Sequence, residues 1–347
     1  MRTSPFDHEP FARPRPGGRP SMIPPSPQIG HVLCPTDFSV FSSRAFRHAL
    51  GFAHQFRARV KVVHVLPHPA NTGSSEFLSL RIAPSQEQRQ QAEADMKEFV
   101  ELAVGSGVDV TTEIRDGQPW REILAAAREL PADLVALGTH GRSGFERFLL
   151  GSVTEKLLAI LPCPTLTVCH EEQRTWEKPS LVKRLLCATD FSPAAAGAVA
   201  MALTLAEKTR AEVTLVHVID ALPEAGGHLN YAVPEIAPLR KVLEEVAAPR
   251  LQAAAPEFLP NGLKVEKRMV IGRAHEKILE IADEESADLI VLGSRGHGLL
   301  GRLLFGSISG CVVREAKCPV LTVPPLGNAL GLGAVEAGAD AQAPRVG

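Results

Sequence analysis

The chain has 347 residues, of which 45% are hydrophobic and 22% are charged, so it is long enough for two domains that each bury a core. Its formal net charge of −2 provides no overall basic field, which argues against nucleic acid and anionic membrane surfaces as partners. No apolar run approaches the roughly 18 to 20 residues that a membrane-spanning helix needs.

Residues 1–28 are rich in Pro and Arg and poor in aliphatic side chains, and they lack the apolar region of a secretory signal. We expect a disordered tail here. Asp7, Glu9 and the prolines argue against the amphipathic helix of a transit peptide.

Between residues 29 and 170, apolar runs of strand length alternate with amphipathic stretches of helix length. The expected strands are His31–Pro35, Val60–Leu66, Val108–Ile114, Leu134–Gly138 and Thr165–Cys169. The expected helices are Ser42–Phe56, Pro84–Val104, Trp120–Glu129 and Val153–Ala159. Strands that are apolar nearly throughout are typical of a sheet covered by helices on both faces. The alternation therefore predicts a parallel sheet, with its ligand site at the carboxyl ends of the strands where the strand order reverses.

The same pattern returns in residues 181–324. VLCPTDFS reappears as LLCATDFS after 153 residues, and ADLVALGTHG reappears as ADLIVLGSRG after 155 residues. A period of this length indicates a domain duplication, because solenoid repeats run only about 20 to 50 residues. We therefore expect two copies of one domain, joined by a polar linker at 171–180 and followed by a flexible Gly/Ala-rich tail at 325–347.

Six cysteines form no CxxC pair and no Cys/His cluster with zinc spacing. Most lie within or beside apolar runs, so we expect small buried side chains in a reducing compartment. Cys34 and Cys187 occupy equivalent strand positions, where packing is favoured over a redox role because nothing in the sequence marks a cationic neighbour.

A glycine-rich stretch follows the fourth strand of each copy and leads into a helix. Gly138-x-x-Gly141 is followed after nine residues by Gly151-Ser152, and copy two repeats this spacing. Glycines let backbone N–H groups approach an anion at a helix N-terminus, which carries partial positive charge. Ser152 is expected to cap the helix, with Glu155 completing a capping box. The alternative that the glycines only turn the chain stays open, because a duplication copies a spacing whether or not it is used.

Asp37 and Asp190 each follow the first strand of their copy. A carboxylate there can accept hydrogen bonds from a ribose. The alternative is that each aspartate caps the following helix. The phosphate motifs GxxxxGK[ST] and GxGxxG are absent at the expected places.

No sequence pattern indicates a catalytic centre, since HExxH, GxSxG and paired carboxylates are absent. His64 and His217 occupy matching strand positions, where a hydrogen-bonded core histidine is expected ahead of a catalytic base. His140 has Arg295 as its counterpart, so catalysis common to both copies cannot depend on it. Three further arginines of the two loops either offset phosphate charge or face solvent: Arg142, Arg147 and Arg302.

Together, TDFS after the first strand, HV in the second and G-x-x-G-x9-G-[ST] after the fourth resemble the universal stress protein family. The resemblance covers about residues 29–170 and 181–324. It implies an α/β fold of two tandem flavodoxin-like (Rossmann-like) domains, each a five-stranded parallel sheet with helices on both faces. It also implies ATP binding, because the glycine loop marks the nucleotide-binding members of the family.

The resemblance further implies which residues contact the nucleotide. Pro35, Thr36 and Asp37 would line the adenosine, with Asp37 on the ribose, and Val65 would contact the adenine. The phosphates would be held by Gly138, Gly141, Gly151, Ser152, Val153 and Thr154. The counterparts in copy two are Thr189, Asp190, Val218, Gly293, Gly296, Gly306, Ser307, Ile308 and Ser309. Copy two departs from the family pattern at Ala188, where the family has Pro, and it has Gly310 in place of Glu155.

These observations give the hypothesis of a cytoplasmic, nucleotide-dependent stress-response or regulatory module. It would have up to two sites for ATP (or AMP/ADP), with Mg²⁺ held through the phosphates. Two alternatives stay open: a nucleotide-free interaction scaffold of the same fold, and a slow ATP hydrolase or nucleotidyl-transfer enzyme. No dedicated base is evident, which disfavours the enzyme.

The family commonly dimerises through its last strand, so the resemblance implies that TLTV of copy one and VLTV of copy two pair with each other. Such pairing would cover two apolar sheet edges. A homodimer of the whole chain also stays open. Finally, Gly138→Val or Gly151→Val is expected to abolish binding at the first site without unfolding the domain, because both glycines are assigned to a loop.

Overall fold

The computed structural model describes residues 27–67, 84–139, 150–168, 182–220, 236–295 and 305–325. The expected linker and nearly all of both expected tails lie outside these ranges. So do Cys169 and the loop residues His140, Gly141, Arg142, Arg147, Gly296 and Arg302.

Strands and helices alternate along both halves of the chain, as the hydrophobic pattern predicts. The first half contains β1 His31–Thr36, α1 Val40–Phe56, β2 Arg59–Pro67, α2 Gln86–Val100, a 3₁₀ turn Glu101–Ala103, β3 Val110–Gly117, α3 Pro119–Glu129, β4 Leu134–Gly138, α4 Ser152–Ile160 and β5 Thr165–Val168. The second contains β6 Arg184–Ala188, α5 Pro193–Thr209, β7 Glu212–Asp220, α6 Ile236–Ala254, β8 Val265–Gly272, α7 Ala274–Glu284, β9 Leu289–Gly293, α8 Ser307–Glu315 and β10 Val320–Val323.

The expected second helix and third strand differ most from the structure. The helix expected at Pro84–Val104 begins at Gln86 because Ser85 forms a capping box with Gln88, and its last turn tightens after Val100 into 3₁₀ geometry. The third strand runs to Gly117 rather than Ile114, and Gly117, at φ 147°, ends it in a conformation that favours glycine.

The strands form one ten-stranded sheet in the order β3-β2-β1-β4-β5-β10-β9-β6-β7-β8. Within each half all neighbouring strands are parallel. The fold class is therefore confirmed. Each half has the order 3-2-1-4-5, in which the chain changes direction across the sheet between the first and fourth strands. Ligands bind at this switch point in doubly wound folds.

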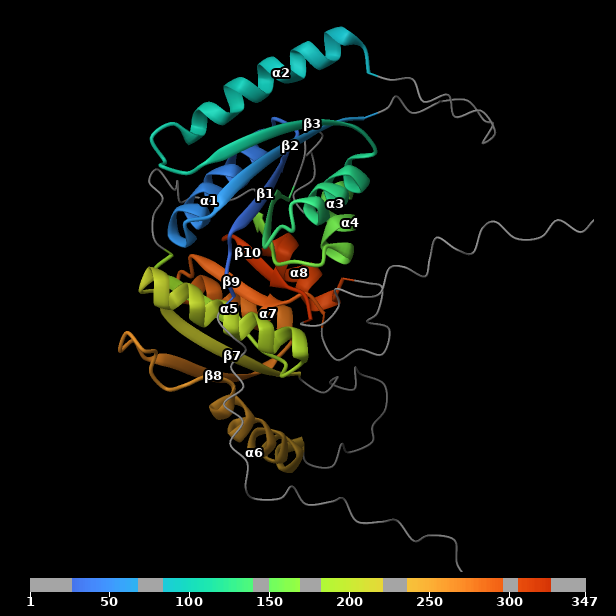
Figure 1. Ribbon diagram of the computed structural model, residues 1–347. Helices are drawn as coiled ribbons and strands as arrows, with labels where there is room; N and C mark the ends of the chain where they lie inside the picture. The colour runs from blue at the N-terminus through green and yellow to red at the C-terminus, as the bar shows by residue number, and fades with distance from the viewer. Residues whose placement is uncertain are drawn as a thin grey trace, which may run out of the picture.

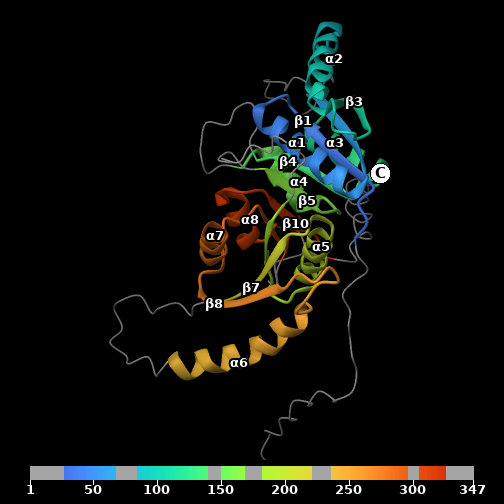
Figure 2. The ribbon, with the colours of Figure 1, turned by 90° about the vertical axis from the view of Figure 1, so that its left-hand side faces the viewer.

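The two halves meet along β5 and β10, which are antiparallel neighbours with Leu166 opposite Leu321. Two threonine hydroxyls reinforce the backbone ladder: Thr167 Oγ1 donates to the Val320 carbonyl at 3.1 Å, and Thr322 Oγ1 donates to the Thr165 carbonyl at 3.3 Å. Both strands are buried throughout. Figures 1 and 2 show the halves stacked about this junction, with α2 and α6 at opposite ends of the molecule. Neither strand is left as an open sheet edge.

Helices cover both faces of the sheet, and successive strand residues alternate between the two. Val32 and Cys34 of β1 belong to a core cluster that continues into the second half through α1 and α5, whereas Leu33 belongs to the cluster under α3 and α4. A third cluster lies under α7 and α8, and it also contains Leu158 of α4. The packing therefore joins the two halves on both faces.

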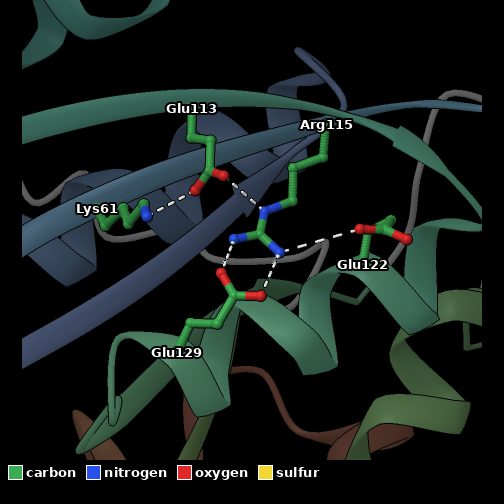
Figure 3. A network of polar contacts seen from close by, with 5 residues as sticks. All are labelled: Lys61, Glu113, Arg115, Glu122 and Glu129. Carbon is green, nitrogen blue, oxygen red and sulfur yellow. Dashed lines mark hydrogen bonds and ion pairs between the residues drawn. The ribbon is translucent and has the colours of Figure 1, made fainter.

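An ion-pair network ties β2, β3 and α3 together (Figure 3). Arg115, whose side chain is 11% exposed, lies 2.8 Å from Glu113, 3.9 Å from Glu122 and in contact with Glu129. Lys61 lies 2.6 Å from the other oxygen of Glu113. Burial opposes ionisation of Glu113, but the hydrogen bonds from Lys61 and Arg115 outweigh it and hold the Glu113 pKa below its ordinary value.

Arg115→Met is expected to lower the free energy of unfolding at pH 7 by about 1–3 kcal/mol, because it removes charged hydrogen bonds from a half-buried carboxylate. The lowered Glu113 pKa contributes stability that is present above the ordinary value of about 4.3 and is lost as pH falls through the folded value. Denaturant unfolding measured between pH 3 and pH 7 should therefore show that the free energy of unfolding decreases less steeply with falling pH in the variant than in the wild type. A pH dependence identical to that of the wild type would contradict this account; Arg128→Met, which removes an exposed arginine of α3, is the control.

Three of the described cysteines are buried, as the sequence predicts, whereas Cys311 and Cys318 are partly exposed. Cys34 and Cys187 are buried in β1 and β6, and burial raises the pKa of both thiols, to about 12 for Cys187. Burial also raises the pKa of Cys163 to about 12. A thiol reacts as the thiolate, so these three are unreactive near neutral pH.

Iodoacetamide applied to the native protein at pH 8 is therefore expected to alkylate Cys311, which is partly exposed, and to leave Cys34 and Cys187 unmodified. Peptide mass spectrometry measures this, with denatured protein as the reference for full labelling. Labelling of Cys34 as fast as that of Cys311 would contradict the assigned packing.

Candidate functional site

A cavity of about 650 Å³ opens at the carboxyl ends of β1, β2 and β4, beside the start of α4. Its volume is in the range of small-molecule sites. Its wall brings together nine predicted residues of the first site, namely Pro35, Thr36, Asp37, Val65, Gly138, Gly151, Ser152, Val153 and Thr154. The tenth predicted residue, Gly141, lies outside the described residues.

The turn after β1 fixes the position of Asp37. Asp37 Oδ1 accepts a hydrogen bond from the Ser39 N–H at 3.1 Å, and Thr36 Oγ1 accepts one from the Phe38 N–H at 2.9 Å. Ser39 caps α1, since its hydroxyl accepts from the Ser42 N–H. The interpretation of Asp37 as the helix cap is therefore wrong. Thr36 is buried and its hydroxyl serves this turn, so its side chain shapes the wall.

His64 is a structural histidine, as expected. Its Nδ1 is 2.8 Å from the Thr36 carbonyl, and its ring stacks on Phe38 with 4.3 Å between centroids. Phe38 has a φ of 62°, an uncommon value for a non-glycine residue. His64, which lies in the neighbouring strand β2, therefore stabilises the turn that contains Asp37 through its contacts with Thr36 and Phe38.

Hydrogen bonds join the two ends of the connection between β4 and α4. The Gly151 N–H donates to the Thr139 carbonyl at 2.8 Å, and Thr154 Oγ1 donates to the Gly138 carbonyl at 2.8 Å. These bonds place the first turn of α4 directly beside the end of β4. Thr154 is buried and its hydroxyl holds this junction. Its contribution to a ligand would accordingly come from the backbone.

The predicted capping box on α4 is wrong. The helix begins at Ser152, its N-cap is Gly151, and no side chain caps it. Gly151 has φ −58° and ψ 137°, which any residue can adopt, so the glycine is not required by backbone conformation. The first intrahelical bond is donated by Glu155 to the Gly151 carbonyl. The N–H groups of Ser152, Val153 and Thr154 thus precede the helical ladder and are suited to an anionic ligand.

Gly138 has a packing role that the sequence did not reveal. A Cβ at this position would lie 3.0 Å from the Phe41 carbonyl carbon and 3.1 Å from its oxygen. Real Cβ atoms are rarely this close to a backbone, so the bare Gly138 lets α1 approach β4. Gly293 does the same for α5, with 2.9 Å from its hypothetical Cβ to the Ala195 nitrogen.

The second half repeats this construction. Asp190 Oδ1 accepts from the Ser192 N–H at 2.9 Å, and Ser192 caps α5. Ser309 Oγ donates to the Gly293 carbonyl at 2.8 Å, and the Gly306 N–H donates to the Ser294 carbonyl at 3.0 Å. The predicted residues Thr189, Asp190, Gly293, Gly306, Ser307, Ile308 and Ser309 thus lie on the same turns as their counterparts. Val218 lies in β7, whereas Gly296 is outside the described residues.

The remaining wall of the first cavity was missed by the sequence analysis. It includes polar side chains of α2, Gln88, Gln91 and Asp95, and Pro119 and Ile123 of α3. Gln91 Nε2 donates to Asp95 Oδ1 at 2.7 Å. The polar run QEQRQQAEAD carries no signal for this role, because a polar helix surface ordinarily faces solvent.

Comparison with known proteins identifies the relatives of this chain. The model of the universal stress protein family matches residues 28–168 and 182–324. A universal stress protein of Mycolicibacterium smegmatis is 27% identical over 311 residues, which cover 88% of this chain and 100% of that protein. One from Methanocaldococcus jannaschii is 34% identical over 143 residues, covering 40% of this chain and 80% of that protein.

A solved structure agrees with this relationship. The crystal structure of a universal stress protein from Archaeoglobus fulgidus aligns with a TM-score of 0.60 and 26% identity, covering 85% of this chain and 96% of that chain. Within the described ranges, no helix is both long and apolar enough to span a bilayer.

Proposed function

The chain belongs to the universal stress protein family, and from this premise we propose that it is an ATP-binding stress-response module with one nucleotide site in each half. The observation that carries the proposal is the first cavity, whose wall contains nine residues predicted from the family motif. Those residues come from β1, β2, β4 and α4, so their convergence depends on the fold and not on their proximity in sequence.

The triphosphate would bind at the start of α4. The N–H groups of Ser152, Val153 and Thr154 precede the helical ladder there, and the helix dipole adds partial positive charge. Gly151 has no side chain to cover these groups. Mg²⁺ would enter with the phosphates, since this ion commonly keeps several waters and binds through substrate phosphates. ADP and AMP would occupy the same cavity with fewer contacts at the helix.

The adenosine would bind between the turn after β1 and the end of β2. Asp37 is oriented by the Ser39 N–H and lies on the cavity wall, where its carboxylate can accept hydrogen bonds from ribose hydroxyls. Pro35 and Val65 supply an apolar wall for the base, and Val65 is 7% exposed. Thr36 contributes the shape of the turn.

We extend the proposal to the second half, because Asp190, Gly293, Gly306 and Ser309 make the same backbone and side-chain bonds as their counterparts. Ala188 replaces the proline of the family pattern, which removes one apolar contact from the adenosine wall. We therefore expect the second site to bind the same nucleotide more weakly than the first.

The proposal is for binding and regulation rather than turnover, and it takes the two halves as a functional pair. The antiparallel ladder between β5 and β10 supports this pairing, as does the burial of both strands. The free thiols among the described residues fit a reducing compartment, and we propose a cytoplasmic location.

Two measurements test this proposal. Mass spectrometry of small molecules released from freshly purified, denatured protein should detect adenine nucleotide. Isothermal titration calorimetry of nucleotide-free protein with ATP and Mg²⁺ should give up to two binding events. Absence of both signals would contradict the proposal and favour an interaction scaffold of the same fold. ATP turnover far above that of a Gly151→Val/Gly306→Val variant would instead favour an enzyme.

A further inference from the structure

An arginine of the second site contacts the helix of the first. Arg295 follows Gly293 and Ser294 at the end of β9, within the glycine motif of the second half. Its Nη2 donates a hydrogen bond of 2.8 Å to the carbonyl of Ala159, which is 136 residues away in α4. Ala159 is the penultimate residue of that helix, whose opposite end forms the wall of the first cavity.

The backbone of Arg295 is held on the side of the second half. The Arg295 carbonyl accepts a hydrogen bond of 3.5 Å from Ser192 Oγ, and the adjacent Ser294 carbonyl accepts one of 3.0 Å from the Gly306 N–H. Ser192 is the N-cap of α5 and Gly306 is the N-cap of α8. The Arg295 side chain therefore extends toward α4 from a backbone that is held by hydrogen bonds within the second half.

Part of α4 also packs against the second half. Leu158 is 5% exposed and belongs to the same core cluster as Ile290 and Val313. Leu150, directly before Gly151, packs against that cluster too. In both views α4 lies next to α8 (Figures 1 and 2). Residues near both ends of the first-site helix thus pack against the other half, while Leu157 packs in the core of its own half.

A cation at the carboxyl end of a helix has two physical effects. It satisfies a carbonyl that lacks a helical partner, and it interacts favourably with the negative end of the helix dipole. Both effects hold the last turn of α4 in place against the second half. Because α4 is short, a fixed carboxyl end also fixes the direction of the N–H groups at its start.

We propose that Arg295 is a positioning residue for the first nucleotide site, supplied by the second half of the chain. This inference rests on the proposed function for its ligand. It assigns the arginine to the partner site rather than to the phosphates of its own loop. The first site is then complete only within the tandem arrangement.

The test measures ATP affinity at each site separately in the full-length chain. Asp190→Ala weakens the second site, so that the first can be titrated with ATP and Mg²⁺. Asp37→Ala weakens the first site, so that the second can be titrated in the same way. In the Asp190→Ala background, Arg295→Met is expected to weaken binding about fivefold, the size of a helix-terminus charge effect. Arg295→Lys should restore most of the affinity, because it keeps a cationic donor. Arg128→Met removes an exposed arginine of α3 and should leave affinity unchanged.

Hydrogen exchange of the nucleotide-free protein provides a readout that does not depend on ATP. Arg295→Met should increase exchange of the last-turn amides of α4, whereas Arg128→Met should not. Unchanged exchange in α4 would overturn the proposed role of the contact. The proposed role would also be overturned if Arg295→Met weakened ATP binding only in the Asp37→Ala background. That result would mean that Arg295 contacts the nucleotide of the second site, to which its own loop belongs. A wild-type protein that binds no ATP would instead overturn the proposed function, while the exchange result still decides the contact.

Discussion

Asp37→Ala is expected to weaken ATP binding at the first site by about 1–3 kcal/mol, or roughly five- to 150-fold, with little change in the stability of the fold. The reason is that Ser39 and Asp37 have different roles in the turn after β1. Ser39 caps α1, whereas Asp37 Oδ1 accepts a hydrogen bond from the Ser39 N–H and Asp37 lies on the cavity wall. Calorimetry with ATP and Mg²⁺ in the Asp190→Ala background measures the affinity, and thermal unfolding measures stability.

Asp37→Asn is the matched control for this variant. Asparagine keeps a side-chain oxygen that can accept the Ser39 N–H, so the turn is retained while the negative charge is removed. We expect its affinity to lie between those of the wild type and Asp37→Ala. If Asp37→Ala unfolds at a markedly lower temperature and yet binds ATP normally, the carboxylate has a structural role only.

Gly138→Val is expected to destabilise the first half by about 1–3 kcal/mol and to reduce ATP binding together with stability. Any Cβ at Gly138 lies about as close to the backbone of Phe41 as non-bonded atoms can come, so α1 must move away from β4. Denaturant unfolding measures the loss. The sequence placed this glycine where the fourth strand meets the glycine-rich loop, and its substitution was expected to affect binding alone; the contact with α1 revises that expectation.

Gly30→Val is the control for Gly138→Val. A Cβ at Gly30 meets only the Asp133 carboxylate, at an ordinary contact distance of 3.6 Å. This variant should unfold close to the wild-type midpoint. A Gly138→Val protein as stable as Gly30→Val, with ATP binding lost, would restore the original loop interpretation.

Much of the fold follows from local patterns in the sequence. The apolar runs identify the strands because a parallel sheet covered on both faces buries nearly every strand residue. The repeated TDFS and ADL motifs identify the duplication. Asp133 shows why the second motif matters structurally: its carboxylate accepts the Gly30 and His31 N–H groups and so aligns β4 with β1. Asp288 does the same with Lys183 and Arg184 in the second half.

The features that the sequence did not predict depend on contacts between distant segments. The polar face of α2 contributes to the cavity only because the helix packs beside β2 and β3. The ion-pair network around Arg115 and Glu113 requires β2, β3 and α3 to come together. The contact of Arg295 with Ala159 needs the relative placement of the two halves. Ser152 resembled a helix cap in the sequence, but the backbone begins the helix one residue earlier than that pattern implies.

The most direct test of the central claim is a crystal structure of the full-length protein with ATP and Mg²⁺. The account predicts that the triphosphate contacts the backbone N–H groups of Ser152, Val153 and Thr154, with the ribose hydroxyls on Asp37. A complex in which the start of α4 carries no phosphate, and in which side chains of the protein fill the first cavity, would contradict it.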